Sequence, residues 1–294
     1  MSSLTSGGES PEDLWTEFTI GKFWDHVCSE PRFEPLYFSK IVAEPLTHLV
    51  RWFVQDRFRS GVACPTVLDY GCGPGYLTEA LVKAGMTVAA MEFSAGSVRA
   101  VNQRLSGVGP GEFLGATSAT ELPTPIESDS FDVVISTEAY EHLRDEWIAG
   151  YFAELNRICK PHGWILVTTP HQEHLDDNLC LCPSCHQMFH RWGHLRSVTR
   201  QSISEHAQRS GLEVQWTSAI KIDSMGHTGG IKQTLRSLAH TSPIGAARWI
   251  RRRASFFTQL LNGTPAWRRH LDLVQRGPHL VMVAKPMEKG PGQI

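Results

Sequence analysis

Short runs of β-branched and other apolar residues alternate with segments of helical periodicity between residues 65 and 168. This alternation is typical of parallel strands joined by helices, and strands buried on both faces appear as nearly continuous apolar runs. The expected strands are 66–70, 87–91, 131–136 and 164–168, and the expected helices are 76–84, 95–105 and 146–159. The sequence therefore predicts an α/β fold with a doubly wound, mostly parallel sheet.

Further elements flank this alternation. Apolar residues recur at three- and four-residue steps from Trp15 to Phe58, which predicts helices that cover the sheet. A helix over 200–210 and strands over 213–220 and 279–284 are expected near the end. We divide the chain into a polar tail (1–12), a helical cover (13–62), a core (63–223 and 275–286) that contains a Cys- and His-rich loop (172–197), and a helical insertion before the last strand (224–274).

Composition limits the classes of protein to be considered. The 294 residues include 28 Lys and Arg against 30 Asp and Glu, so no overall positive field indicates a nucleic-acid-binding protein. No apolar run approaches the roughly 18 residues that span a bilayer, and the first residues lack the basic and apolar regions of a signal peptide. We expect a cytoplasmic protein. Seven cysteines, an odd number, argue against a disulfide framework.

A glycine-rich turn follows the strand 66–70 and precedes a helix. Gly71, Gly73 and Gly75 would let the backbone approach a ligand at the carboxyl edge of the sheet, where doubly wound folds bind nucleotides. The preceding Asp69 would repel a pyrophosphate and attract an amine. The turn therefore favours the amino-acid end of S-adenosylmethionine. Glu92, at the end of the next strand, is placed to accept hydrogen bonds from two ribose hydroxyls.

These features resemble the class I S-adenosylmethionine-dependent methyltransferases, through Val67 to Gly75, Glu92 and Phe131 to Ile135. The resemblance implies a Rossmann-like, seven-stranded methyltransferase fold and an enzyme that uses this cofactor. It also implies the roles of individual residues: Asp69, Gly71, Gly73 and Gly75 line the methionine moiety, Glu92 holds the ribose, Phe93 flanks the adenine, and Glu138 contacts the cofactor.

The chain departs from this family at one position. Many members carry an acid that binds the adenine amino group just before the segment corresponding to Ala119–Pro123, whereas this chain has Ser118. We therefore expect Ser118 and backbone groups around Ala119 to contact the adenine.

A histidine after the strand 131–136 is the first candidate for a catalytic base. Methyl transfer to oxygen requires alignment and removal of a proton, and His142, with an ordinary pKa near 6.5, can accept one at neutral pH. The sequence Glu141–His142–Leu143 also resembles the ubiquinone-biosynthesis type of O-methyltransferase. His171, after the strand 164–168, is the second candidate. Alternatively, His142 only caps or packs the following helix.

The loop 172–197 has the ligand types and close spacing of a small zinc site. We expect Cys182, Cys185, His190 and His194 to hold one structural zinc ion, with Cys180 or His186 able to replace one ligand. Four protein ligands leave no open position, so this zinc would order the loop and take no part in the chemistry.

A second metal hypothesis uses other residues. Glu138, Glu141 and His142, followed by a distant histidine, resemble the metal site of methyltransferases that modify the 3′-terminal ribose of small RNAs. By that resemblance, a divalent cation would grip two ribose hydroxyls and lower the pKa of the attacking one.

Basic residues are concentrated before the last strand. The segment from Ser224 to Leu271 contains no Asp or Glu but eight Lys and Arg. It is expected to cover the acceptor site and indicates an anionic acceptor, such as a nucleotide sugar. A solvated helical face or peripheral membrane contact is the alternative.

The leading functional hypothesis is O-methylation of a hydroxyl on a small molecule or glycan. A ribose 2′-O-methyltransferase acting on RNA and a cofactor-binding module without catalysis are the alternatives. The sequence assigns no oligomeric state.

Overall fold

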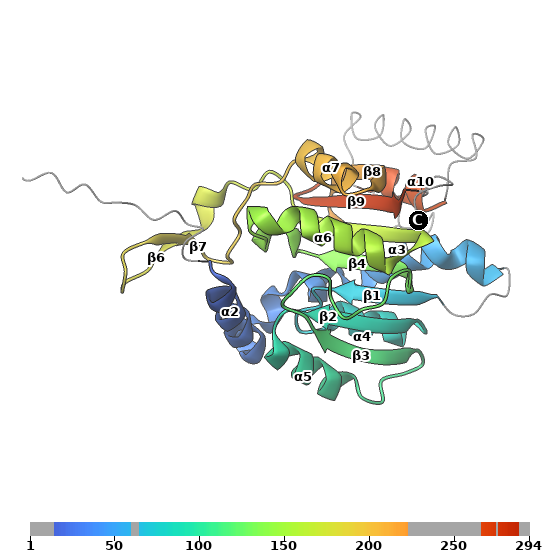
Figure 1. The fold of residues 1–294 in the computed structure, drawn as a ribbon, viewed down its shortest axis with the longest axis horizontal. Helices are drawn as coiled ribbons and strands as arrows, with labels where there is room; N and C mark the ends of the chain where they lie inside the picture. The colour runs from blue at the N-terminus through green and yellow to red at the C-terminus, as the bar shows by residue number, and fades with distance from the viewer. Residues whose placement is uncertain (1–14, 60–64, 223–265, 275, 288–294) are drawn as a thin grey trace, which may run out of the picture.

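The computed structural model of the chain describes residues 15–59, 65–222, 266–274 and 276–287. Its centre is a seven-stranded sheet with the strand order β3-β2-β1-β4-β5-β9-β8 (Figure 1). The strands are β1 (Thr66–Tyr70), β2 (Thr87–Glu92), β3 (Glu112–Ser118), β4 (Phe131–Thr137), β5 (Cys159–Pro170), β8 (Leu212–Ile220) and β9 (His279–Pro286). β9 pairs antiparallel with both β5 and β8, whereas β1 to β5 pair in parallel. The predicted α/β fold with a mostly parallel sheet is confirmed.

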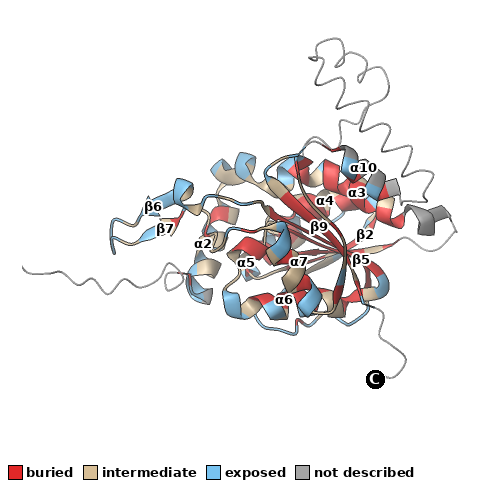
Figure 2. Ribbon diagram, turned by 90° about the horizontal axis from the view of Figure 1, so that it is seen from above, coloured by how far each residue is buried: buried red, intermediate tan, exposed pale blue. Residues whose placement is uncertain are grey.

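Helices cover both faces of the sheet. Successive residues of a strand point to opposite faces, so the central strands contribute apolar side chains to a core on each side. Along β4, Val133 and Ile135 pack in one buried cluster and Val134 packs in another. The first cluster includes residues of α3 (Phe38–Arg59), α4 (Tyr76–Lys83) and α10 (Ala266–Leu273), and the second includes residues of α6 (Asp145–Ile158) and α7 (Arg200–Arg209). Figure 2 shows these buried surfaces directed toward the sheet. α5 (Ala95–Leu105) contacts β3 and β2.

The described N-terminal segment, residues 15–59, forms two α-helices joined by a 3-10 turn. α2 (Glu17–Ser29) begins at Thr16, whose side chain accepts a hydrogen bond from the backbone N–H of Thr19. A 3-10 turn, η1 (Pro31–Leu36), separates it from α3. In Figure 1, α2 lies at the edge of the molecule where the parallel strands end, so it stands beside the carboxyl ends of β1 and β4.

Two strand regions were not among the expected elements. β3 lies at one edge of the sheet, is mostly half-exposed or exposed, and contains Gly115, so it lacks the apolar run of a central strand. β6 (Leu179–Leu181) and β7 (Met188–His190) form a separate antiparallel hairpin inside the Cys- and His-rich loop. Three-residue strands are too short to show a period in the sequence.

The described end of the predicted insertion, residues 266–274, packs in the core. In α10, the ring of Trp267 lies 5.3 Å from those of Phe53 and Trp164, and Leu271 is buried. The rest of the insertion and the tail 1–12 lie outside the described residues. No helix among the described residues is both long and apolar enough to cross a membrane.

Candidate functional site

The glycine turn between β1 and α4 adopts conformations that favour glycine at all three expected positions. Gly71, Gly73 and Gly75 have φ values of 78°, 50° and 75°. Gly71 and Gly73 line a cavity of about 850 Å³. Gly75 does not line this cavity; a Cβ there would approach the side chain of Val101 in α5 at 3.1 Å. Its role is close packing of the turn against α5.

Asp69 lies behind the glycine turn and is not part of the cavity wall, where a contact with the methionine moiety was expected. The hydroxyl of Thr78 in α4 donates a hydrogen bond of 2.6 Å to its carboxylate. Burial raises the pKa of Asp69 to about 7. Asp69 therefore ties β1 to α4 beneath the turn.

Glu92 stands at the cavity wall. Its two carboxylate oxygens accept hydrogen bonds of 2.7 Å from the backbone N–H groups of Gly73 and Phe93. Burial raises the pKa of Glu92, and these N–H groups oppose that shift. The carboxylate is thereby fixed between the ends of β1 and β2.

Only some of the residues expected to contact the adenine reach the cavity. Phe93 and Ala119 line the cavity, but Ser118 does not. The Ser118 hydroxyl instead donates to the carbonyl oxygen of Phe93 at 3.4 Å. Ser118 therefore lies beside this wall and not in it.

The N-terminal helices close the cavity over the sheet edge. Their contribution is largely aromatic and comes from α2, η1, Tyr37 and the start of α3: Trp24, Phe33, Tyr37 and Phe38. Across the cavity, the Trp24 ring lies 5.0 Å from that of His142 and the Phe33 ring lies 6.4 Å from that of Trp192. The sequence predicted a helical cover, but only the fold shows that it supplies a wall of the site.

Glu138 and Glu141 follow β4 and reach the same cavity. Glu138 has a positive φ of 50°, accepts a hydrogen bond of 3.0 Å from Thr168, and lies 3.6 Å from His279. Glu141 is only 1% exposed. One of its oxygens accepts from the hydroxyl of Thr169 at 2.9 Å, and the other, Oε1, has no hydrogen-bond partner. Burial raises the pKa of Glu141 well above its ordinary value, and Glu138 raises it further.

His142 lies in η2 (Tyr140–His142), directly after Glu141. Its Nδ1 is 3.2 Å from the carbonyl oxygen of Gly193, which can only accept, so Nδ1 carries the proton and Nε2 is an acceptor. Burial lowers the pKa of His142 well below its ordinary value, and the nearby His194 lowers it further. His142 is therefore a neutral imidazole at the cavity wall.

His171 also lines the cavity, at the end of β5. Its backbone N–H donates to Pro278 at 2.7 Å, and its Nδ1 lies 3.3 Å from the carbonyl oxygen of Val198. Both candidate bases thus reach the same cavity, from neighbouring strands.

His190 and His194 gather around Glu173 and not around the cysteines. Glu173 lies 2.5 Å from Nδ1 of His194 and 3.3 Å from Nε2 of His190, and the two imidazoles stack at 4.4 Å. Although burial alone would raise the pKa of Glu173, its contacts with these histidines lower it.

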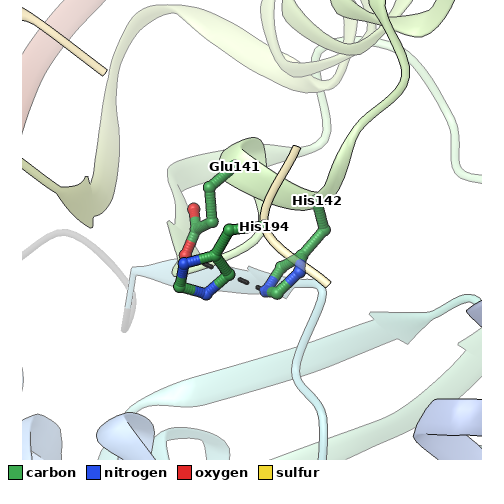
Figure 3. A group of neighbouring side chains, drawn as sticks. All are labelled: Glu141, His142 and His194. Atoms are coloured by element: carbon green, nitrogen blue, oxygen red, sulfur yellow. Dashed lines mark ion pairs between the residues drawn. The ribbon is translucent and has the colours of Figure 1, made fainter. Parts of the chain in front are cut away.

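His194 also completes a second group. Ligand atoms of Glu141, His142 and His194 lie within 4.8 Å of one another, and Figure 3 shows the three side chains converging. Nε2 of His142 lies 3.9 Å from Oε1 of Glu141, the oxygen without a partner.

The predicted zinc ligand set is not brought together. Cys182 and Cys185 lie in the turn of the hairpin, while His190 pairs with Leu179 at the far end of β7. Because a strand rises about 3.3 Å per residue, the hairpin separates Cys182 from His190 by roughly three residue steps. In the part of the chain that the structure describes, no group of neighbouring ligand atoms combines these thiols with these imidazoles.

Sequence reasoning missed Glu173, His279 and the aromatic wall. Glu173 belongs to the loop after β5, but its partner His194 lies 21 positions further along the chain, with no regular spacing that links them. His279 reaches Glu138 only because β9 is inserted next to β5.

Known proteins resemble this chain in both sequence and fold. The profile of a family described as methyltransferase domain matches residues 40–216, which is more than half of the chain. A ubiquinone biosynthesis O-methyltransferase of Pseudomonas paraeruginosa is 32% identical over 152 residues, covering 50% of this chain and 57% of that protein. An uncharacterized methyltransferase of Mycobacterium ulcerans is 31% identical over 127 residues, covering 43% and 47%. The chain thus spans about half the length of these curated relatives.

Among solved structures, an S-adenosylmethionine-dependent methyltransferase from Clostridium acetobutylicum superposes with a TM-score of 0.51 at 10% identity, covering 87% of this chain and 98% of that one. At this identity the likeness concerns the fold. The family match and the strand order agree with it. The chain belongs to the methyltransferase-domain family and has the fold of the class I S-adenosylmethionine-dependent methyltransferases.

Proposed function

We propose that this protein transfers a methyl group from S-adenosylmethionine to a hydroxyl oxygen of a small molecule or glycan. The observation that carries the proposal is a single cavity with the glycine turn and Glu92 on one side and the neutral imidazole of His142 on another. The Pseudomonas relative is named an O-methyltransferase, which supports the choice of oxygen.

The wall beside β1 and β2 suits this cofactor. Gly71 and Gly73 bring backbone to the cavity surface, and nothing within 4 Å would meet a Cβ at Gly73, so the space above the turn is open to a ligand. Glu92 offers acceptor oxygens for ribose hydroxyls, and Phe93 offers an apolar ring for adenine. Bound there, S-adenosylmethionine supplies an electrophilic methyl group.

His142 is suited to take the proton from the acceptor hydroxyl. Its Nδ1 proton is committed to the carbonyl oxygen of Gly193, so Nε2 is the basic nitrogen. A neutral imidazole at the cavity wall can accept a proton at any pH above its lowered pKa. His171, on the next strand, is the second candidate for this role.

A second candidate function is metal-assisted methylation of a ribose hydroxyl in RNA, and the group in Figure 3 favours it. Glu141, His142 and His194 offer one carboxylate oxygen and two imidazole nitrogens. In that case His142 would bind the cation and not the proton, and the cation would lower the pKa of the attacking hydroxyl.

Transfer of labelled methyl groups tests the proposal. The full chain is incubated with methyl-labelled S-adenosylmethionine and a fractionated cell extract, with and without a chelator, and Glu92→Ala serves as the control with weakened cofactor binding. Label in a small-molecule or glycan fraction that persists with chelator is the expected result. Label in RNA that disappears with chelator favours the second candidate. Intact cofactor binding without label in any fraction indicates a binding module without catalysis and contradicts both.

A further inference from the structure

Two neighbouring cysteines, Cys182 and Cys185, lie outside the site described above. Cys182 and Cys185 lie in the turn between β6 and β7; Cys185 is exposed and Cys182 is half-exposed. In Figure 1 this hairpin extends away from the sheet and its helices. The two thiols are therefore carried on an arm at the surface and take no part in the cavity wall.

The turn is shaped for a thiolate pair. The backbone N–H of Cys182 donates to Gln187 at 2.9 Å, and that of His186 donates to the carbonyl oxygen of Cys182 at 2.8 Å. His186 adopts a positive φ of 59°, which reverses the chain. The sulfur of Cys182 accepts hydrogen bonds from the backbone N–H groups of Cys185 and Ser184 and from the Cys185 thiol. The turn therefore holds the two sulfurs next to each other.

The described residues supply only half of a tetrahedral zinc site here. His190 and His194, the other ligands predicted from the sequence, are held by Glu173 beside the cavity. The thiols of Cys182 and Cys185 belong to no group of three neighbouring ligand atoms in the described part of the chain. Structural zinc is almost always bound by four ligands, so a zinc ion at this turn would need two ligands besides Cys182 and Cys185.

Apolar side chains flank the turn and indicate what covers it. Leu181 and Met188 face each other across the hairpin and are 57% and 47% exposed. A second copy of the same hairpin would bury these residues and also supply two thiolates. Homodimers commonly use such a two-fold contact between identical surfaces.

We propose that the Cys182–Cys185 turn is a zinc half-site, and that the same turn of a second copy of this chain completes a four-thiolate centre. One zinc ion would join two chains through their projecting arms. The site goes beyond methyl transfer, because it is independent of the cavity that holds the candidate bases.

Zinc titration of the full chain, with molecular mass measured by light scattering, tests this proposal. The expected result is a zinc-dependent dimer with about half an ion per chain, which dissociates when a chelator removes the metal. Cys182→Ser and Cys185→Ser should each abolish zinc retention and the dimer. His162→Gln, which removes an exposed imidazole in β5, away from the hairpin, is the control and should leave both unchanged.

Two further measurements separate this centre from other arrangements. Cobalt in place of zinc should show the strong thiolate charge-transfer absorbance of four sulfurs, and Leu181→Gln should weaken the dimer without loss of the thiols. One zinc ion per monomer that depends on His190 and His194 would overturn the proposal in favour of a site within one chain. The proposal would also be overturned if the chain binds no zinc, or if dimerisation does not depend on zinc.

Discussion

The carboxylate of Glu173 lies 2.5 Å from Nδ1 of His194 and fixes the proton on that nitrogen, so that Nε2 of His194 is free to accept. Residues that orient an imidazole in this way are regular neighbours of metal ligands and tune their affinity. Glu173 therefore connects the loop after β5 to the group formed by Glu141, His142 and His194.

This relationship predicts the behaviour of the candidate metal group. If the group binds a divalent cation, Mn²⁺ titrated calorimetrically into the protein should bind, and Glu141→Gln should abolish binding. Glu173→Gln should weaken binding by about 10- to 100-fold, because the orienting carboxylate is lost. Glu121→Gln, at an exposed carboxylate of the same cavity, serves as the control. Absence of Mn²⁺ binding in the wild type would remove the metal-assisted function.

His142→Gln tests the assignment of the base. The expected loss in kcat is about 10² to 10⁴, with unchanged affinity for S-adenosylmethionine, because the imidazole acts on the acceptor. Since the pKa of His142 is lowered, wild-type kcat/KM should stay constant as the pH falls through 6.5 and decline only below that. His171→Gln is the comparison. A normal rate in the His142 variant together with a reduced rate in the His171 variant would show that His171, and not His142, is the base.

Glu92→Ala should weaken S-adenosylmethionine binding at least tenfold, by removing acceptor oxygens for two ribose hydroxyls, each worth about 1.5 to 3 kcal/mol. Isothermal titration measures the change. Glu92 also accepts hydrogen bonds from the backbone N–H groups of Gly73 and Phe93. The thermal stability of the ligand-free variant should therefore be measured as well, to show that the turn is still folded. Equal affinity in wild type and variant would contradict the ribose assignment.

Asp69 predicts an unusual pH dependence of stability. Its pKa is raised to about 7 in the folded protein and is near 3.9 when unfolded, so the folded protein keeps a proton that the unfolded chain has released. With respect to this group, the free energy of unfolding is highest below about pH 4. It falls by about 4 kcal/mol as the pH rises toward 7, because the unfolded chain then releases a proton that the folded protein keeps. Asp69→Asn, which preserves an acceptor for Thr78, should therefore gain stability relative to wild type over this range in urea unfolding.

Asp132→Asn is a control, because the pKa of Asp132 is shifted in the opposite direction to that of Asp69. Burial alone would raise the pKa of Asp132, but hydrogen bonds from Thr66 and Lys160 outweigh burial and lower it. Its contribution is present above the unfolded pKa and is lost as the pH falls, so this variant should be less stable than wild type at neutral pH. Identical pH profiles for the two variants would contradict the assignment for Asp69.

Gly75→Ala and Gly73→Ala should separate packing from cofactor binding. At Gly75 a Cβ adds a 3.1 Å contact with Val101 to a left-handed backbone, so stability should fall by about 1 to 3 kcal/mol. At Gly73 only the backbone cost of about 1 kcal/mol applies, but the methyl group enters the cavity surface and should weaken cofactor binding. Unfolding curves and titration of the cofactor measure the two effects.

The sequence alone determined the parts of this protein that depend on local pattern. The alternation of strands and helices, the glycine turn and Glu92 occur within short segments whose periodicity and turn chemistry are visible in the residues. The expected bounds of β1, β2, β4, α4, α5 and α6 match the observed ones within one residue, because buried parallel strands and their helices have continuous apolar patterns. The strand expected at 164–168 is longer, since β5 begins at Cys159 and ends at Pro170.

Only the tertiary structure decided which distant side chains meet. The hairpin β6–β7 moved Cys182 away from His190, and the turn after it brought His194 to Glu141 and His142. Insertion of β9 beside β5 placed His279 against Glu138. Close spacing of ligand types in a sequence indicates a metal site only if the chain between them folds back on itself. An extended hairpin separates neighbours, whereas the meeting of strand ends at one sheet edge joins residues far apart in the chain.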